Sequence, residues 1–114
     1  MSRFDGKVAL ITGAASAVEG ELMGFGGRAA WRMLREGGSV VIADIADERG
    51  EKSVAQMRDA GLDAAYLHLD VTSEGDWSAA VNATVSQFGR LDILINVPGT
   101  SDRDSIINTD ADTW

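Results

Sequence analysis

The chain has 114 residues, which is enough for one domain, and its 45% hydrophobic and 25% charged residues are ordinary values for a globular protein. No apolar stretch approaches the roughly 18 residues of a membrane span, the net charge of −8 disfavours binding to the phosphate backbone of nucleic acids, and no cysteine is present to ligate a metal or form a disulfide. Because the first residues also lack the apolar run of a signal peptide, we expect a soluble, cytoplasmic protein with no nucleic-acid or membrane partner and no metal.

Strand and helix patterns alternate from the start of the chain. Residues 7–12 form a short apolar run that ends at Gly13, as expected of a strand buried on both faces of a parallel sheet. Residues 27–36 predict a helix that is closed by Gly37. Residues 39–44 then repeat the pattern of a buried strand.

The alternation continues in the second half of the chain. Asp47 can cap a helix over residues 47–60, and residues 64–69 are a weaker strand candidate because apolar and polar residues alternate only in part. The clearest helix covers residues 74–88, since a hydroxyl cap precedes it and a carboxylate follows that cap by three residues. One face of this helix is predicted to carry a stripe of packing residues, Trp77, Val81, Thr84, Val85 and Phe88. Trp31 on the first helix is likewise expected to be a packing residue.

The last strand candidate, residues 91–97, is a near-continuous apolar run that would normally lie between two neighbouring strands. Residues 98–108 are predicted to be a loop, and residues 109–114 have the pattern of a capped first helical turn with nothing after it. A helix that stops in its first turn is not a natural end, so we expect a chain truncated from a longer protein. Its last strand would then be an exposed edge through which the chain self-associates.

Glycines follow the first strand in two groups, Thr12-Gly13-Ala14-Ala15-Ser16 and Gly24-Phe25-Gly26. Glycines between a strand and a helix let the backbone approach a pyrophosphate, which the N–H groups at the start of the helix then bind. This arrangement resembles the glycine motif of the short-chain dehydrogenases/reductases, which is Thr-Gly, three residues and Gly-x-Gly. Deleting residues 17–23 restores that motif in full, so we interpret them as an insertion.

The spacing to the next motif also indicates an insertion. Gly13 precedes Asp44 by 31 positions, whereas the family's distance from glycine to acid is about two dozen. Read without a gap, the second and third glycine positions would fall on Ala17 and Glu19. A carboxylate would then occupy a phosphate site.

The inserted residues 17–23 have two alternative structures. They form a loop, or they lengthen the following helix, because residues 16–19 are themselves a capping-box pattern. Either form brings Glu19 and Glu21 toward the phosphates, and a carboxylate about 4 Å from a phosphate costs from ~1 kcal/mol in water to ~4 kcal/mol at a protein surface. We therefore expect weak dinucleotide binding that tightens when residues 17–23 are deleted.

Three further segments resemble the family. Asp44 ends the second strand, where the resemblance implies hydrogen bonds to the adenosine ribose and a preference for NAD over NADP; the alternative is a helix-capping or solvated aspartate. The pair of residues 70 and 71 resembles the family's adenine contact, although Asp-x-Thr is also ordinary helix capping. Residues 88–96 resemble the entry to the fourth strand, after which Val97 and Pro98 depart from the family's Asn-Ala and remove an amide side chain and a backbone N–H.

The candidate cofactor-binding residues are Gly13, Ser16, Gly24, Phe25, Gly26, Asp44, Ile45, Asp70, Val71, Asn96 and Gly99.

Catalytic residues of the family are not found in this sequence. The resemblance implies a tyrosine as acid/base, a lysine four residues on, and a serine that orients the substrate, but no Tyr-x-x-x-Lys occurs here. The only tyrosine, Tyr66, is followed at that spacing by Asp70. The only histidine, His68, is expected to be a half-exposed strand residue.

The resemblance implies an α/β fold, a Rossmann-like doubly wound parallel sheet with four strands in the order 3-2-1-4 and three helices. Residues 1–114 would form a single, partial NAD-binding domain. The function implied is that of an NAD-dependent oxidoreductase that transfers hydride between nicotinamide and an alcohol or carbonyl substrate, present here as an amino-terminal fragment that is inactive alone. The alternatives are a non-catalytic half-domain that binds a nucleotide or a partner, and a degenerate inactive product.

Overall fold

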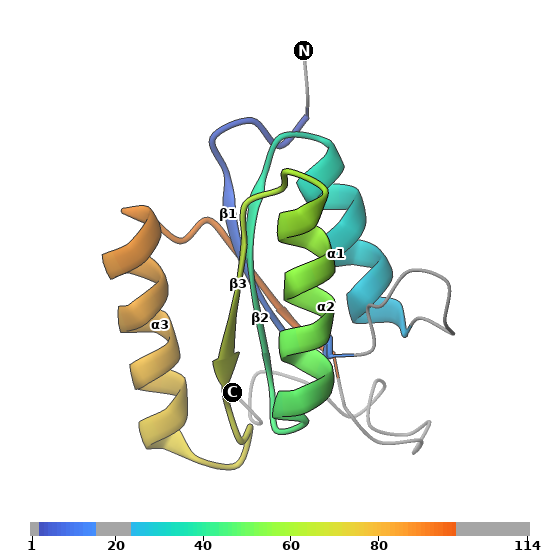
Figure 1. Cartoon of the computed structure of the whole chain (residues 1–114). Coiled ribbons are helices and arrows are strands. Elements are labelled where there is room, and N and C mark those ends of the chain that lie inside the picture. Colours follow the sequence, from blue (N-terminus) through green and yellow to red (C-terminus); the bar gives the residue numbers. More distant parts are fainter. Residues whose placement is uncertain (1–2, 16–23, 98–114) are drawn as a thin grey trace.

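The computed structural model describes residues 3–15 and 24–97, and these form a parallel sheet with helices between the strands (Figure 1). The strand order is β3-β2-β1-β4, which confirms the predicted order and fold class. The predicted loop at 98–108, the helical turn at 109–114 and the inserted residues 17–23 lie outside the described residues. In chain order the elements are β1 (Val8–Thr12), α1 (Phe25–Arg35), β2 (Ser39–Asp44), α2 (Asp47–Asp59), β3 (Ala64–His68), α3 (Glu74–Phe88) and β4 (Ile93–Asn96).

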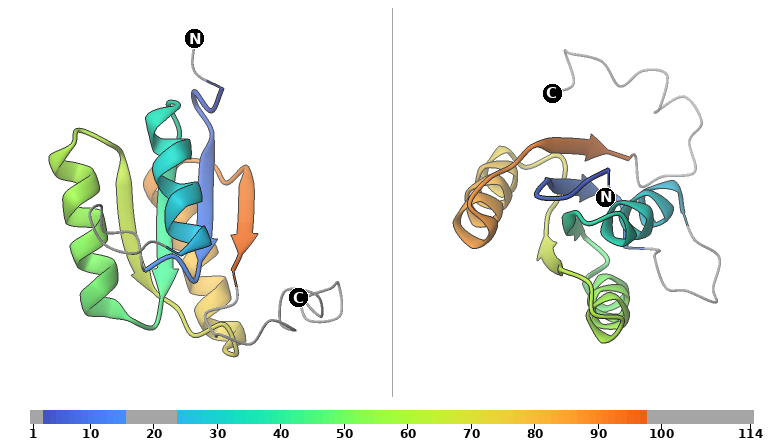
Figure 2. Two further views of the ribbon diagram at one scale, coloured as in Figure 1. Left: turned by 90° about the vertical axis from the view of Figure 1, so that its right-hand side faces the viewer. Right: turned by 90° about the horizontal axis from the view of Figure 1, so that it is seen from above.

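Helices cover both faces of the sheet, as the near-continuous apolar strands predicted. Helices α1 and α2 lie on one face and α3 lies on the other (Figure 2). Strand β1 is buried along its whole length, and its side chains alternate between the two cores. Ile11 packs with the core under α1 and α2, and Leu10 packs with the core under α3. Full burial of each of these two side chains contributes about 1.5–3 kcal/mol.

The helix starts differ from the predictions in two places. Helix α1 begins at Phe25, two residues earlier than predicted. The predicted cap of α2 was wrong, because Asp47 is the first residue of the helix and Ala46 is its N-cap without a side-chain hydrogen bond. The physical reason is that other groups occupy the Asp47 carboxylate: the Tyr66 hydroxyl and the His68 ring both bind it.

The cap of α3 was predicted correctly. The Ser73 hydroxyl accepts a hydrogen bond of 3.1 Å from the Asp76 backbone N–H, and Gly89 ends the helix in the left-handed conformation. The predicted stripe was wrong at Val85, whose side chain is exposed. Thr84 is buried as the stripe predicted, Trp77, Val81 and Phe88 pack against the core under α3, and Ala80, which the stripe did not include, is also buried.

Strand β4 lies at an edge of the described sheet. It pairs with β1 and, within the described ranges, has no strand on its other side. Its Leu94 side chain is 42% exposed, which agrees with the predicted apolar edge. In residues 3–15 and 24–97, none of the helices is both long enough and apolar enough to span a bilayer.

Candidate functional site

The carboxyl ends of the four parallel strands lie along one edge of the sheet. The pairing register places Thr12 beside Asn96 and beside Ala43, and it places Asp44 beside His68. In open α/β sheets, ligands bind outside this edge, where the strand order reverses. The reversal occurs between β1 and β4, so Thr12 and the glycine loop after it lie at the centre of the candidate site.

Gly13 is required by the backbone that packs against it. Its φ is +71°, and a Cβ added there would lie 2.0 Å from the Val97 carbonyl oxygen. The Gly13 N–H donates to the Ala43 carbonyl oxygen at 2.9 Å, so this residue also continues the pairing between β1 and β2. A glycine here permits both the sharp exit from β1 and the close approach of the chain that leaves β4.

Gly26 sets how closely α1 approaches the glycine loop. A Cβ on Gly26 would lie 3.1 Å from the Ala14 Cβ and 3.2 Å from the Gly13 carbonyl oxygen, which is closer than ordinary van der Waals contact. Gly24 is the N-cap and has no capping side chain, and the first turn of α1 contains no acidic residue. The N–H groups at the start of α1 therefore face the loop as hydrogen-bond donors, in the arrangement that binds anions.

Two further residues, Phe25 and Ser16, were predicted to belong to this loop. The Phe25 side chain is 73% exposed at the start of α1, so it contributes to the surface beside the loop and not to the core. Ser16 lies outside the described residues.

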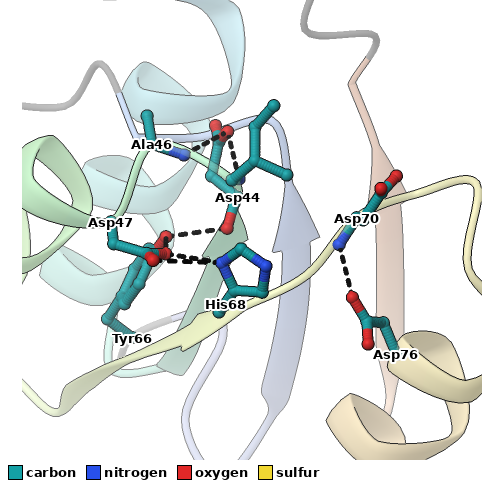
Figure 3. Close-up of polar contacts among 8 residues, drawn as sticks. Asp44, Ala46, Asp47, Tyr66, His68, Asp70 and Asp76 are labelled. Atoms are coloured by element: carbon teal, nitrogen blue, oxygen red, sulfur yellow. Dashed lines mark hydrogen bonds and ion pairs between the residues drawn. The ribbon is translucent and has the colours of Figure 1, made fainter.

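The Asp44 carboxylate accepts hydrogen bonds from three backbone N–H groups. Figure 3 shows the one from Ala46. Oδ1 accepts from Ile45 at 2.7 Å and from Ala46 at 3.2 Å, and Oδ2 accepts from Ala15 at 3.2 Å. The carboxylate thus joins the end of β2 to the glycine loop, which was not predicted. A carboxylate accepts about four hydrogen bonds, so the three from the described residues leave capacity for about one more donor.

Ser53 is a site residue that the sequence analysis missed. Ser53 is completely buried, and its hydroxyl lies 2.8 Å from the Ala15 carbonyl oxygen, so it bonds α2 to the glycine loop. The available signal was a polar residue on the apolar face of a predicted helix, next to Val54 and before Met57. That signal is ambiguous, because the sequence does not indicate which group the Ser53 hydroxyl bonds to.

A polar cluster of Asp47, Tyr66 and His68 lies next to the Asp44 turn (Figure 3). The Tyr66 hydroxyl lies 2.7 Å from the Asp44 carbonyl oxygen and 2.6 Å from Asp47 Oδ1, and it can donate to one of them at a time. His68 Nδ1 lies 2.8 Å from the same Oδ1 of Asp47. His68 was predicted to be a half-exposed strand residue, and its side chain is 56% exposed at the end of β3.

The cluster shifts the pKa of each of its members. Hydrogen bonds from Tyr66 and then from His68 lower the pKa of the Asp47 carboxyl. The hydrogen bond to Asp47 raises the pKa of His68, and burial followed by the hydrogen bond to Asp47 raises the pKa of the Tyr66 hydroxyl. Tyr66 therefore stays protonated and acts as a hydrogen-bond donor, not as a base.

Asp70 and Val71 form the turn between β3 and α3. Asp70 Oδ1 accepts from the Thr72 N–H at 2.9 Å and from its hydroxyl at 2.7 Å, and these bonds lower the pKa of the Asp70 carboxyl. The Asp70 N–H donates to Asp76 Oδ2 at 2.9 Å, and the Trp77 ring N–H donates to the Val71 carbonyl oxygen. The Val71 side chain is left 48% exposed, as is Ile45 at 65% on the neighbouring turn.

Asn96 ends β4 and is bonded across the sheet. The buried Thr12 hydroxyl donates to Asn96 Oδ1 at 2.6 Å, and the Val97 N–H donates to the Thr12 carbonyl oxygen at 3.2 Å. The Val97 side chain packs against the core under α1 and α2. Gly99 lies outside the described residues, and within the described ones no three potential metal ligands come together.

Comparison with known proteins identifies the family. The family model described as short chain dehydrogenase matches residues 7–114. Momilactone A synthase from Oryza sativa subsp. japonica is 46% identical over 84% of the chain, which spans 32% of that enzyme. Cyclopentanol dehydrogenase from Comamonas sp. is 36% identical over the whole chain, which spans 43% of that enzyme.

Solved structures give the same result. A hydroxysteroid dehydrogenase from Escherichia coli superposes with a TM-score of 0.73 at 35% identity, over 82% of this chain and 37% of the other. A short chain dehydrogenase/reductase from Burkholderia phymatum, solved in complex with NAD, superposes with a TM-score of 0.69 at 33% identity, over 82% of this chain and 31% of the other. From the glycine loop, the strand order and these matches, the chain belongs to the short-chain dehydrogenase family.

Proposed function

We propose that this chain is the nucleotide-binding portion of an NAD-dependent oxidoreductase that acts on an alcohol or carbonyl substrate. The observation that carries the proposal is the hydrogen bond between Asp44 and Ala15, because it joins the residue expected at the ribose to the loop expected at the pyrophosphate. The family match and the NAD complex of the Burkholderia phymatum relative support the proposal. When bound, NAD would accept or supply the hydride.

The residues present fit a dinucleotide. Gly26 lets the start of α1 lie close to the glycine loop at Ala14, and the N–H groups of the first turn of α1 would meet the charge of a pyrophosphate there. The exposed apolar side chains of Ile45 and Val71 flank the same edge of the sheet and would contact the two faces or the rim of the adenine ring. Asp70, held in place by Thr72, would accept a hydrogen bond from the exocyclic amine.

Asp44 is the basis for proposing NAD over NADP. Its remaining acceptor capacity suits one ribose hydroxyl, whereas a 2′-phosphate would meet its negative charge. Substituting Asp44→Asn should weaken NAD binding by about tenfold to a hundredfold, since a hydrogen bond to a charged group contributes about 1.5–3 kcal/mol. It should weaken NADP binding much less.

Isothermal titration calorimetry of the unaltered chain and of Asp44→Asn with each dinucleotide tests this proposal. Asp63→Asn is the matched control, because Asp63 is an exposed carboxylate that accepts a hydrogen bond from Ser39 at the other end of the sheet. Its affinity for NAD should equal that of the unaltered chain. An unaltered chain that binds NADP more tightly than NAD contradicts the proposed preference.

The segment 17–23 remains the proposed cause of weak binding. Glu19 and Glu21 belong to it, and a chain without residues 17–23 should bind NAD more tightly in the same titration. Equal affinities of the two forms would remove the insertion from the explanation.

We also propose that residues 1–114 do not catalyse hydride transfer by themselves. The sequence contains no Tyr-x-x-x-Lys, and its only tyrosine, Tyr66, has its hydroxyl within hydrogen-bond distance of Asp47. Incubation with NAD and a panel of alcohols should produce no NADH above the background without protein. NADH formation would contradict this.

A second candidate function is that of a non-catalytic half-domain that binds a partner. The observation that favours it is the edge strand β4, which borders an open groove of about 590 Å³ lined in part by Phe25, Ile93 and Ile95. Apolar edges of this kind promote association. Sedimentation velocity over a range of concentrations tests the case in which the partner is a second copy of the chain, because a chain that remains monomeric at high concentration argues against self-association through β4.

A further inference from the structure

We propose that Asp47, Tyr66 and His68 form a positioning cluster that fixes the turn carrying Asp44 and thereby sharpens the choice of NAD over NADP. This inference rests on the proposed function, in which Asp44 meets the ribose. None of the three residues belongs to the glycine motif or to the acid at the end of β2. Each is placed to act through the turn and not on the cofactor itself.

The contacts of Tyr66 carry the first step. Its hydroxyl lies between the Asp44 carbonyl oxygen, at 2.7 Å, and Asp47 Oδ1, at 2.6 Å. These two acceptors stand on either side of the turn formed by residues 45 and 46. Because the hydroxyl donates to one of them at a time, it ties either the start or the end of the turn to β3.

The contacts of Asp47 carry the second step. Its Oδ1 is shared by the Tyr66 hydroxyl, at 2.6 Å, and by His68 Nδ1, at 2.8 Å, and the same Nδ1 lies 3.1 Å from Oδ2. Tyr66 and His68 lie two residues apart in β3, so their bonds to Asp47 fix the first turn of α2 to that strand. Since β3 also pairs directly with β2, the end of β2 and the start of α2 are both bonded to β3.

Gly50 is independent evidence that the position of the Tyr66 ring is fixed by its packing against α2. A Cβ on Gly50 would lie 2.0 Å from Tyr66 Cε1 and 2.5 Å from Cδ1, so the ring occupies the space that any other residue would need. Glycine is otherwise unfavourable inside a helix. Its presence at this position of α2 is explained by the ring that lies against it.

The consequence for specificity follows from the Asp44 carboxylate. Within the part of the chain that the structure describes, three backbone N–H groups donate to it and leave capacity for about one further donor, so its orientation decides whether that capacity faces the ribose. A turn released from Tyr66 would let Asp44 rotate away. Discrimination against a 2′-phosphate would then fall more than general affinity.

Tyr66→Phe is the decisive variant, because it removes the hydroxyl, changes no charge at neutral pH and keeps the ring. The ratio of the Kd for NADP to the Kd for NAD should fall by about threefold to tenfold, the effect of losing one hydrogen bond. The matched control is Thr84→Val, which also removes a hydroxyl hydrogen bond, this one buried and on the far face of the sheet in α3. The control should leave the ratio unchanged even if it lowers stability.

Amide hydrogen exchange of the ligand-free chain provides a readout that does not depend on binding. Exchange at Ile45 and Ala46, whose N–H groups bond to Asp44, should accelerate in Tyr66→Phe and not in Thr84→Val. Unchanged exchange, or an equal loss of affinity for NAD and NADP, would overturn the positioning role. An unaltered chain that binds neither dinucleotide would instead overturn the proposed function, while the exchange rates still decide whether the cluster fixes the turn.

Discussion

Replacing Gly50 by alanine should destabilise this chain, although the same change stabilises most helices. Gly50 lies within α2, where the intrinsic preference for alanine over glycine is worth up to about 1 kcal/mol. Against this, the new Cβ would lie 2.0 Å from the Tyr66 ring. The ring cannot move aside freely, because it packs against the core under α1 and α2 and its hydroxyl is bonded to the Asp44 turn.

The magnitude follows from these opposing effects. Overpacking at a tight site costs about 1–3 kcal/mol, and displacement of the ring also sacrifices a hydrogen bond worth about 1 kcal/mol. Together the two losses exceed the gain in helix propensity, so we expect a net loss of about 2 kcal/mol in the free energy of unfolding. Urea denaturation followed by far-ultraviolet circular dichroism measures this value directly.

Two comparisons make the experiment specific. Gly75→Ala in α3 should be neutral or stabilising, because the nearest atom to its Cβ, the Ser73 hydroxyl oxygen, is 3.8 Å away. In a chain that already carries Tyr66→Ala, the change Gly50→Ala should become stabilising, since the ring that it meets is gone. A Gly50→Ala chain as stable as the unaltered one would refute the reasoning, as would the same loss in both backgrounds.

Three other predictions follow from the site. Gly13→Ala should lower the free energy of unfolding by about 3 kcal/mol in urea denaturation, because it combines a positive φ with a clash against the Val97 carbonyl. Ser53→Ala should cost about 1–3 kcal/mol in the same assay, since it leaves a buried carbonyl oxygen of the glycine loop without its donor. The pKa of His68 should lie above its ordinary value of about 6.5 in an NMR titration of the ring protons, because Asp47 holds the protonated form. The stability that this pair contributes is then fully present below the unfolded pKa of His68 and is lost as the pH rises through the folded pKa.

Each of these predictions has a control in the chain. Gly61→Ala has a positive φ of +81° but no atom near its Cβ, so it should cost only about 1 kcal/mol. Ser78→Ala, at an exposed position of α3, should change stability by less than about 0.5 kcal/mol. In Asp47→Asn the pKa of His68 should fall toward its ordinary value; a His68 that titrates identically in both chains would contradict the assigned pair.

The sequence alone determined the order and type of the elements. Buried parallel strands require continuous apolar runs, and those runs at residues 7–12 and 39–44 identified β1 and β2 to within one residue. Ser73 identified the start of α3, because the donor that its hydroxyl accepts from lies three residues away in the chain. The glycine motif and Asp44 identified the family and the edge of the sheet at which the candidate site lies.

Only the tertiary structure decided which side chains meet at that edge. The bonds from Asp44 to Ala15, from Ser53 to Ala15 and from Tyr66 to Asp44 join residues 22 to 38 positions apart. Local periodicity carries no information about such pairs, and an aspartate that starts a helix has the same pattern whether it caps the helix or binds another strand. Asp47 was therefore predicted as a cap, and the folded chain instead uses it to hold Tyr66 and His68, because the parallel pairing of β2 with β3 brings those side chains to the first turn of α2.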